Sequence, residues 1–114
     1  QLLLNRGEYG GVRYFKPETI DMFTSNQSKV SRRGLGFDRF DPNPKNEYPS
    51  KLANNSVYGH TGYTGTCIWV DPQNQLNYIF LSNRVHPQVS TKLYNLNIRS
   101  RIQDVIYETI NEAK

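Results

Sequence analysis

The chain has 114 residues, of which 36% are hydrophobic, 12% aromatic and 21% charged, enough apolar content for one small domain. This composition excludes a disordered tail and a collagen-like fibre, and its apolar runs, residues 2–4 and 78–81, are too short for a membrane span. One cysteine and two histidines exclude an internal disulfide and a cysteine-rich zinc site, so we expect neither a metal nor a cofactor. The formal charge of +4 permits anion binding, but without a basic stripe we expect no nucleic-acid partner.

The first seven residues have the pattern of a helix end. Three leucines, residues 2–4, precede Asn5-Arg6-Gly7, and glycine directly after an apolar helical turn is a common stop signal. We therefore expect the chain to be a fragment whose first helix begins before Gln1. A short apolar arm is the alternative.

Residues 17–24 are predicted to form a short helix, preceded by an extended segment at residues 12–15. Pro17 suits the first helical position, and Ile20 and Phe23 fall on one helical face. Beyond this helix, residues 34–38 (Gly-Leu-Gly-Phe-Asp) predict a short strand with a close backbone approach at its glycines.

The middle of the chain is rich in proline and in basic residues. Three prolines with several asparagines and serines predict a long loop at residues 41–55. We expect the basic side chains to lie on a solvated surface around it, an anionic partner being the alternative. They are Lys29, Arg32, Arg33, Arg39, Lys45 and Lys51.

The second half predicts three strands, at residues 57–62, 66–70 and 76–82. The last two form a hairpin around the turn residues 71–74. The apolar run 78–81 implies cover on both of its faces, and the spacing of Cys67 and Trp69 places both in the core.

A C-terminal amphipathic helix is predicted at residues 96–112, because apolar residues recur there at helical spacing: Ile98, Ile102, Val105, Ile106 and Ile110. The charged residues off this stripe are expected to be solvated: Arg99, Arg101, Asp104 and Glu108. The fold class is therefore α+β, an antiparallel sheet of two to three strands packed against this helix.

The segment with the most chemical information is residues 58–66, Tyr-Gly-His-Thr-Gly-Tyr-Thr-Gly-Thr. Its glycines let another molecule approach the backbone and leave N–H groups free to donate. His60 is the titratable side chain among them, so the strand suits a carbonyl or carboxylate ligand. A glycine-rich turn with a surface histidine explains the same pattern equally well.

The second half of the chain resembles the serine β-lactamase and penicillin-binding-protein superfamily. The resemblance is carried by this segment, the strand and Asp71-Pro72 turn after it, the returning strand ending at Asn83 and the C-terminal helix. Residues 34–37 match the Gly-Leu-Gly-aromatic strand that commonly precedes the motif. The resemblance is to the last third of the class C-like branch, which includes esterases and D-amino-acid peptidases, and within it to proteins of Bacteroidetes-like bacteria.

The resemblance implies that the catalytic nucleophile lies outside the chain. The family uses a Ser-x-x-Lys nucleophile, a Tyr-x-Asn or Ser-x-Asn pair and a Lys-Thr-Gly strand. The third motif alone is matched, as His60-Thr61-Gly62, with histidine in the place of lysine. Residues 1–114 are therefore expected to be the C-terminal portion of one β-lactamase-like domain, inactive in isolation, with the remainder of that domain as its partner.

The resemblance also implies roles for four residues. The N–H of Tyr63 would be an oxyanion-hole donor and thus the catalytic group of this chain. His60 would orient the substrate, Thr61 would hydrogen-bond the substrate or the Tyr-x-Asn pair, and Gly62 would keep the strand clear of the acyl group. The segment after the last strand can line the site in this family, which makes Asn83 and Arg84 weaker candidates.

Histidine in place of lysine at position 60 changes the substrate that we expect. Lysine is a permanent cation, whereas histidine is mostly neutral at pH 7, so ester, amide or D-peptide hydrolysis is favoured over strong β-lactamase activity. The expected substrate is a small molecule or peptide, and the resemblance implies a periplasmic or cell-envelope location. A non-catalytic binding module for a cell-wall or anionic polymer is the alternative function.

Overall fold

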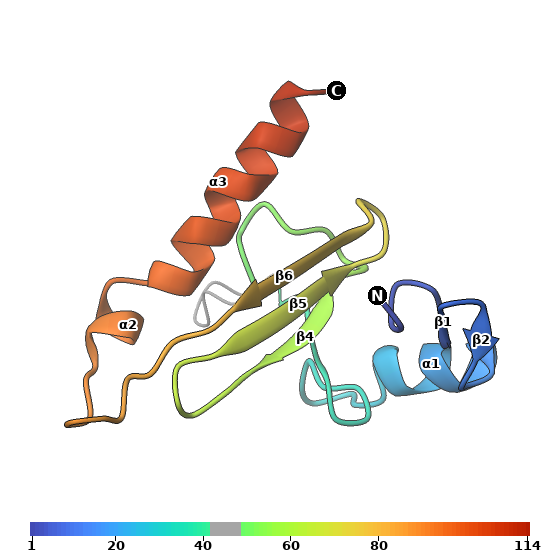
Figure 1. Ribbon diagram of the computed structural model, residues 1–114, viewed down its shortest axis with the longest axis horizontal. Coiled ribbons are helices and arrows are strands. Elements are labelled where there is room, and N and C mark those ends of the chain that lie inside the picture. The colour runs from blue at the N-terminus through green and yellow to red at the C-terminus, as the bar shows by residue number, and fades with distance from the viewer. Residues whose placement is uncertain (42–48) are drawn as a thin grey trace.

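The computed structural model describes residues 1–41 and 49–114. Two antiparallel sheets form within them, a two-stranded sheet β1-β2 and a four-stranded sheet in the order β3-β4-β5-β6 (Figure 1). In chain order the elements are β1 (Glu8–Tyr9), β2 (Val12–Arg13), α1 (Pro17–Thr24), β3 (Asp38–Arg39), β4 (Tyr58–Thr61), β5 (Cys67–Asp71), β6 (Leu76–Phe80), α2 (Lys92–Asn95) and α3 (Ile98–Glu112).

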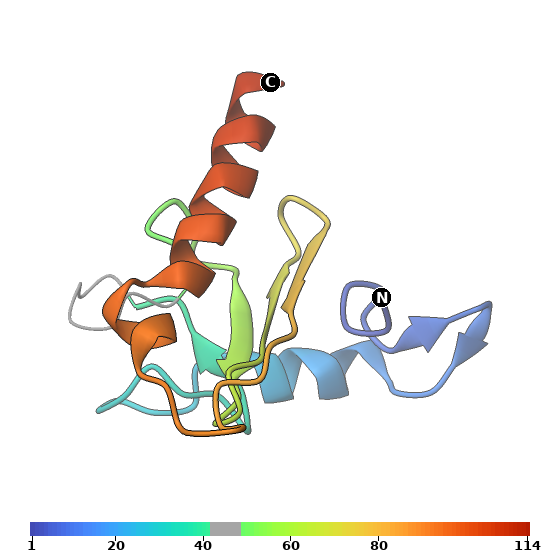
Figure 2. The same ribbon diagram turned by 60° about the vertical axis from the view of Figure 1, so that its left-hand side comes forward.

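The larger sheet separates the two helical parts of the chain. Helix α3 lies along one side of it, and α1 with the β1-β2 hairpin lies on the other (Figure 2). The predicted α+β class with an antiparallel sheet and a C-terminal helix is confirmed. The sheet has four strands, one more than expected, because the two residues of β3 pair with Tyr58 and Gly59.

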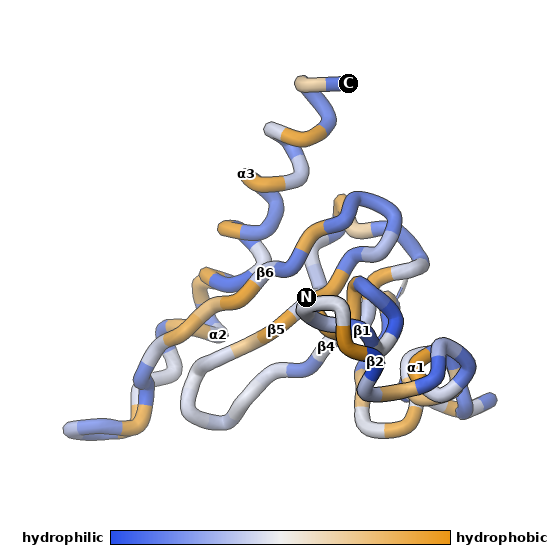
Figure 3. The backbone as a smooth tube through the Cα atoms, turned by 45° about the vertical axis from the view of Figure 1, so that its right-hand side comes forward, coloured by the Kyte–Doolittle hydropathy of each residue, from blue (hydrophilic) through white to orange (hydrophobic). Residues whose placement is uncertain are grey.

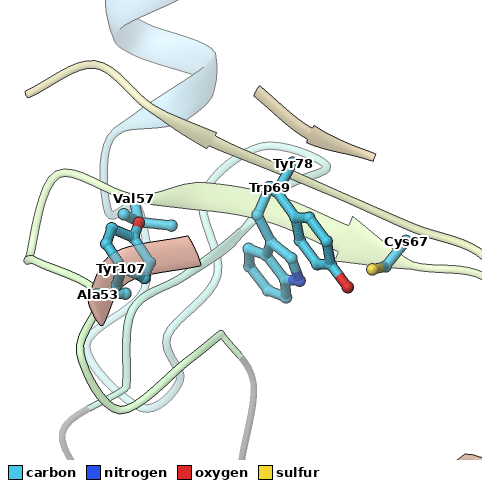
Figure 4. Close-up of a cluster of buried hydrophobic side chains, with 6 residues drawn as sticks. All are labelled: Ala53, Val57, Cys67, Trp69, Tyr78 and Tyr107. Atoms are coloured by element: carbon cyan, nitrogen blue, oxygen red, sulfur yellow. The ribbon is translucent and has the colours of Figure 1, made fainter. Parts of the chain in front are cut away.

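The core lies between this sheet and α3. Trp69 on β5 pairs with Tyr78 on β6, and both rings project from the same side of the sheet (Figure 4). The predicted core positions of Cys67 and Trp69 are confirmed, with 4% and 1% of each residue exposed. The buried cluster consists of Ala53, Val57, Cys67, Trp69, Tyr78 and Tyr107.

Helix α3 confirms the predicted helix but presents a different face to the sheet. Apolar residues recur along it (Figure 3), yet Ile102 is 40% and Val105 60% exposed. The buried residues are instead mostly polar, namely Arg99, Ser100, Gln103 and Tyr107. The expectation that Arg99 is solvated is therefore wrong, and its backbone carbonyl also accepts a 2.9 Å hydrogen bond from the Tyr78 hydroxyl.

A buried carboxylate joins the β5-β6 turn to α3. Asp71 accepts hydrogen bonds from the Tyr107 hydroxyl at 2.7 Å and from the Asn54 and Asn74 amides at 2.8–2.9 Å. Burial alone would raise the pKa of Asp71, but the hydrogen bonds from these neighbours outweigh it and lower the pKa. Burial and the same contact raise the pKa of Tyr107.

The predictions of a helix end at residues 1–7 and of a helix at residues 17–24 agree with the structure. Helix α1 spans the predicted residues 17–24. Residues 1–7 form a single turn that closes as a helix end does, with the Gly7 N–H donating to the Leu2 carbonyl at 2.9 Å and a positive φ of 49° at Arg6.

Two expectations about strands need correction. Residues 34–37 are a turn, not a strand, because the Gly34 N–H donates to the Phe37 carbonyl at 2.8 Å and Gly36 has a φ of +89°. In the run 78–81, one face stays open within the described residues, since Ile79 is 58% and Leu81 78% exposed.

The basic middle region is not uniformly solvated. Arg39 is half-buried and donates to the carbonyls of Thr24 and Asn55, both at 2.7 Å. Much of the predicted loop, together with Lys45, lies outside the described residues. Among the described residues, no helix combines the length and the apolarity that crossing a membrane requires.

Candidate active site

The His-Thr-Gly segment ends β4 and enters a tight hairpin turn. The Gly62 N–H donates to the Thr66 carbonyl at 2.8 Å, and the Gly65 N–H donates to the Gly62 carbonyl at 3.0 Å. Gly65 adopts a φ of +107°, which closes this short turn into β5 and disfavours a side chain at that position. The sequence left a glycine-rich turn as the alternative to a binding strand, and the structure places such a turn directly after the strand that carries His60.

This turn fixes the direction of the Tyr63 backbone N–H. Tyr63 lies in the turn beyond the end of β4, so the direction of its N–H follows from the trans peptide that it shares with the Gly62 carbonyl, and the N–H points opposite to that carbonyl. The Gly62 carbonyl, in the same peptide plane, is held by Gly65. Among residues 1–41 and 49–114 the Tyr63 N–H has no hydrogen-bond acceptor, which leaves it as an oriented donor at the end of the strand.

The segment after β6 holds the other side of the turn. The Tyr63 carbonyl accepts a 2.7 Å hydrogen bond from Arg84 Nε, and the Thr64 carbonyl accepts one from the Arg84 backbone N–H at 2.9 Å. The Gly65 carbonyl accepts a 3.0 Å bond from the Ser82 hydroxyl. Three consecutive carbonyls of the turn are thus bound by two residues of one segment.

Two arginines and a tyrosine stack behind the turn. The Arg84 guanidinium lies 4.6 Å from the centroid of the Tyr63 ring and 4.8 Å from that of Tyr94. Arg99 of α3 lies 5.1 Å from the Tyr94 ring and donates from Nη1 to the Thr66 carbonyl at 2.9 Å. Sequence reasoning named Arg84 as a weak candidate and missed Arg99, because nothing in a helical charge pattern marks a contact with a distant strand.

The geometry around His60 determines its tautomer. Nδ1 lies 2.7 Å from the Thr61 carbonyl, which can only accept, so Nδ1 carries the proton. Nε2 lies 3.4 Å from Nη1 of Arg33, which can only donate, so Nε2 presents its lone pair. In this arrangement Nε2 accepts from the Arg33 guanidinium, which the sequence analysis placed on a solvated surface.

Two glycines of the segment are required by close packing. A Cβ at Gly59 would lie 2.0 Å from the Ile68 carbonyl oxygen, and a Cβ at Gly62 would lie 2.3 Å from the Thr66 hydroxyl. Glycine at position 62 therefore has a structural reason that is independent of any substrate.

An open hollow of about 350 Å³ adjoins the segment. It is bordered by His60, Thr61 and Gly62 on the polar side and by Ile68, Ile79 and Leu81 on the apolar side, with Thr66 and Cys67 at its base. Cys67 is buried, and burial raises the pKa of its thiol, which argues against a nucleophilic role. Asn83 caps its own turn by accepting from the Val85 and His86 N–H groups at 3.0 and 3.2 Å.

The chain was compared with known proteins. A family model described as "Beta-lactamase" matches residues 12–102. A protein described as "Putative D-alanyl-D-alanine carboxypeptidase" from Escherichia coli K12 is 37% identical over 98 residues, which are 86% of this chain and 23% of that protein. A protein of the same description from Salmonella paratyphi B is 35% identical, with the same coverage.

The fold agrees with these sequence relatives. The crystal structure of a penicillin-binding protein homologue from Caulobacter crescentus superposes with a TM-score of 0.54 and 22% identity, over 72% of this chain and 23% of that one. The chain spans less than a quarter of the length of the relatives that it matches. By its sequence, the chain belongs to the β-lactamase family of serine hydrolases, and its fold agrees with that assignment.

Proposed function

We propose that this chain supplies the oxyanion-side strand of a serine hydrolase that cleaves an ester or amide, of the β-lactamase, esterase or D-peptidase type. It would form the C-terminal portion of one β-lactamase-like domain and be inactive in isolation. The observation that carries the proposal is the oriented Tyr63 N–H beside His60 and Thr61. The coverage of 23% of the E. coli relative supports a catalytic serine contributed by residues outside these 114.

The chemistry assigned to this strand is acyl transfer. A serine hydroxyl attacks the substrate carbonyl carbon while a base outside these residues takes its proton, and the π electrons move to the carbonyl oxygen. Collapse of that oxyanion breaks the bond to the alcohol or amine, which leaves with the proton, and water then hydrolyses the acyl-serine. A backbone donor fixed before the reaction stabilises the oxyanion without reorganising, and such a donor is typically worth ~10²–10³ in rate. In this proposal Tyr63 provides that N–H.

The neighbouring residues then act on substrate orientation. His60 and Thr61 border the hollow beside the turn, where the substrate would lie along β4. Gly62 keeps the strand narrow at the acyl group, a role compatible with its close contact to Thr66. The description of the E. coli relative favours a peptide that ends in D-alanine within this substrate class.

The test compares the 114-residue chain with the full-length protein that contains it, using a p-nitrophenyl ester and a D-alanyl-D-alanine peptide. We expect background rates for the chain alone, and turnover for the full-length protein that is abolished when its nucleophilic serine is replaced by alanine. Serine-dependent turnover by the chain alone above a buffer blank, or no hydrolysis by the full-length protein, would contradict the proposal. The latter result with retained polymer binding would favour a non-catalytic binding module.

A further inference from the structure

We propose that Tyr94 of α2 is a positioning residue for the oxyanion donor. Its ring holds the two arginines that bind carbonyls at opposite ends of the hairpin turn, and it thereby keeps the Tyr63 N–H in the direction that the reaction requires. The inference rests on the proposed function and adds to its site a residue that lies outside the turn and its motif.

Tyr94 is the common neighbour of Arg84 and Arg99. The Arg84 guanidinium lies 4.8 Å from the centroid of the Tyr94 ring, and that of Arg99 lies 5.1 Å from it. Arg84 Nε donates to the Tyr63 carbonyl at 2.7 Å. Arg99 Nη1 donates to the Thr66 carbonyl at 2.9 Å. One aromatic ring thus contacts the two side chains that hold both ends of the turn.

The backbone that carries this ring is anchored on both sides. The preceding residue, Leu93, is buried, and a Cβ at Gly65 would lie 3.4 Å from its Cδ2 atom, so α2 packs closely against the turn. The Tyr94 carbonyl accepts a 3.0 Å hydrogen bond from the N–H of Asn97, the residue before α3. The ring is therefore attached to a segment that is fixed to the turn at one end and to α3 at the other.

A neutral ring suits this place better than a carboxylate would. An aromatic face attracts a guanidinium through its quadrupole and adds no net charge. A carboxylate would bind the two arginines more tightly, but its negative charge would lie near the developing oxyanion and would oppose it. Tyr94 therefore orients both arginines without adding a negative charge near the Tyr63 N–H.

The experiment uses the full-length protein with a p-nitrophenyl ester, which is neutral, and a D-alanyl-D-alanine peptide, which carries a carboxylate. In Tyr94→Leu we expect kcat to fall about 10-fold for both substrates with KM nearly unchanged, because a displaced oxyanion donor weakens the transition state alone. Tyr94→Phe keeps the aromatic face and should retain most of kcat. Tyr9→Leu, which removes a tyrosine that is 57% exposed on β1, is the matched control and should change neither constant.

A double variant shows whether Tyr94 acts through an arginine. If it does, Arg84→Ala/Tyr94→Leu should lower kcat by less than the product of the two single effects. Amide hydrogen exchange tests the same point without turnover. The Gly65 N–H, which donates to the Gly62 carbonyl, should exchange faster in Tyr94→Leu than in wild type.

The outcomes separate this role from the proposed function. Unchanged kcat in Tyr94→Leu, an equal loss of kcat in Tyr94→Phe, or a rise in KM for the peptide alone would overturn the positioning role and leave the hydrolase assignment standing. A wild-type protein that hydrolyses no acyl substrate would overturn both. Thermal unfolding of each variant establishes that a lower kcat does not come from a lost fold, and Tyr94→Met is the second ring-free variant, with the same expected result.

Discussion

Arg84 binds Tyr63 twice, through a 2.7 Å hydrogen bond from Nε to its carbonyl and through a guanidinium 4.6 Å above its ring. The carbonyl belongs to the peptide that follows the proposed oxyanion donor. Because Ser82 and the Arg84 backbone bind the next two carbonyls, the direction of the Tyr63 N–H depends on a segment some twenty residues further along the chain.

Arg84 is therefore predicted to be a positioning residue for the oxyanion donor. In the full-length enzyme, Arg84→Ala should lower kcat about 10- to 100-fold with little change in KM, for charged and neutral acyl substrates alike, because an oxyanion donor acts on the transition state. Guanidinium ion at millimolar concentration should restore part of kcat. Amide hydrogen exchange should show faster exchange of the Gly65 N–H in the variant.

The control for this prediction is Arg101→Ala, an exposed arginine on α3. It should leave kcat and the exchange rate of Gly65 unchanged. A rise in KM for charged substrates alone in Arg84→Ala would show that Arg84 contacts the substrate directly, and unchanged kinetics would show that the turn keeps its geometry without it.

Elements with strong local signals could be predicted from the sequence, and contacts between distant segments could not. Pro17 fixed the start of α1, and the β-branched and aromatic residues around Trp69 identified β5. The buried face of α3 was misjudged because Arg99 and Tyr107 are buried through hydrogen bonds to Thr66 and Asp71, partners that no helical periodicity reveals.

The contacts of the candidate site could likewise be predicted only in part from the sequence. The glycines around His60 left a turn and a binding strand as equal interpretations of the sequence. Arg33 was read as solvated because its partner is 27 residues away, although its position directly before the Gly-Leu-Gly turn placed it near the strand that pairs with β4. Its contact with His60 depends on the folded chain, which brings the two residues together.

Gly62→Ala is predicted to destabilise the hairpin by about 1–3 kcal/mol, because the added methyl would lie 2.3 Å from the Thr66 hydroxyl. The double variant Gly62→Ala/Thr66→Ala should recover most of this loss, since it removes the clashing atom. Gly59→Ala faces the Ile68 backbone at 2.0 Å and has no such rescue. Urea unfolding measures the free energy of each variant.

The single variant Thr66→Ala is the reference for this comparison, because the double variant must be measured against it. If the double variant were as unstable as Gly62→Ala, the cost would arise from the backbone conformation at position 62 and not from the contact with Thr66.

Asp71 should make stability depend on acid pH. Its hydrogen bonds lower its pKa in the folded chain, so it binds a proton less readily there than in the unfolded chain. Its contribution is thus fully present above the unfolded pKa of about 3.9 and is lost as the pH falls through the lower folded value. Asp71→Asn should cost about 2 kcal/mol at pH 7 and flatten the loss of stability below pH 4.

The measurement is the free energy of unfolding of wild type and Asp71→Asn between pH 2 and pH 7. Tyr107→Phe removes one of the donors to Asp71 and should show a smaller version of the same change. Parallel pH profiles for wild type and Asp71→Asn would mean that other carboxylates cause the acid dependence.

His60→Lys separates two explanations of substrate choice. If position 60 simply lacks a positive charge, lysine there should increase the preference for a carboxylate substrate about 10-fold. With Arg33 already 3.4 Å from the imidazole, a second cation would instead repel the guanidinium and displace it, at a cost of about 1 kcal/mol even at the dielectric constant of bulk water. We therefore expect His60→Lys to show no stronger carboxylate preference than wild type, measured in the full-length protein as the ratio of kcat/KM for an acyl substrate with a free carboxylate and for its methyl ester. His60→Gln is the matched neutral variant, since its amide oxygen can still accept from Arg33, and it should retain most of the preference. A 10-fold stronger carboxylate preference in His60→Lys, together with its loss in His60→Gln, would show that the site lacks a positive charge at position 60 and that Arg33 does not supply it.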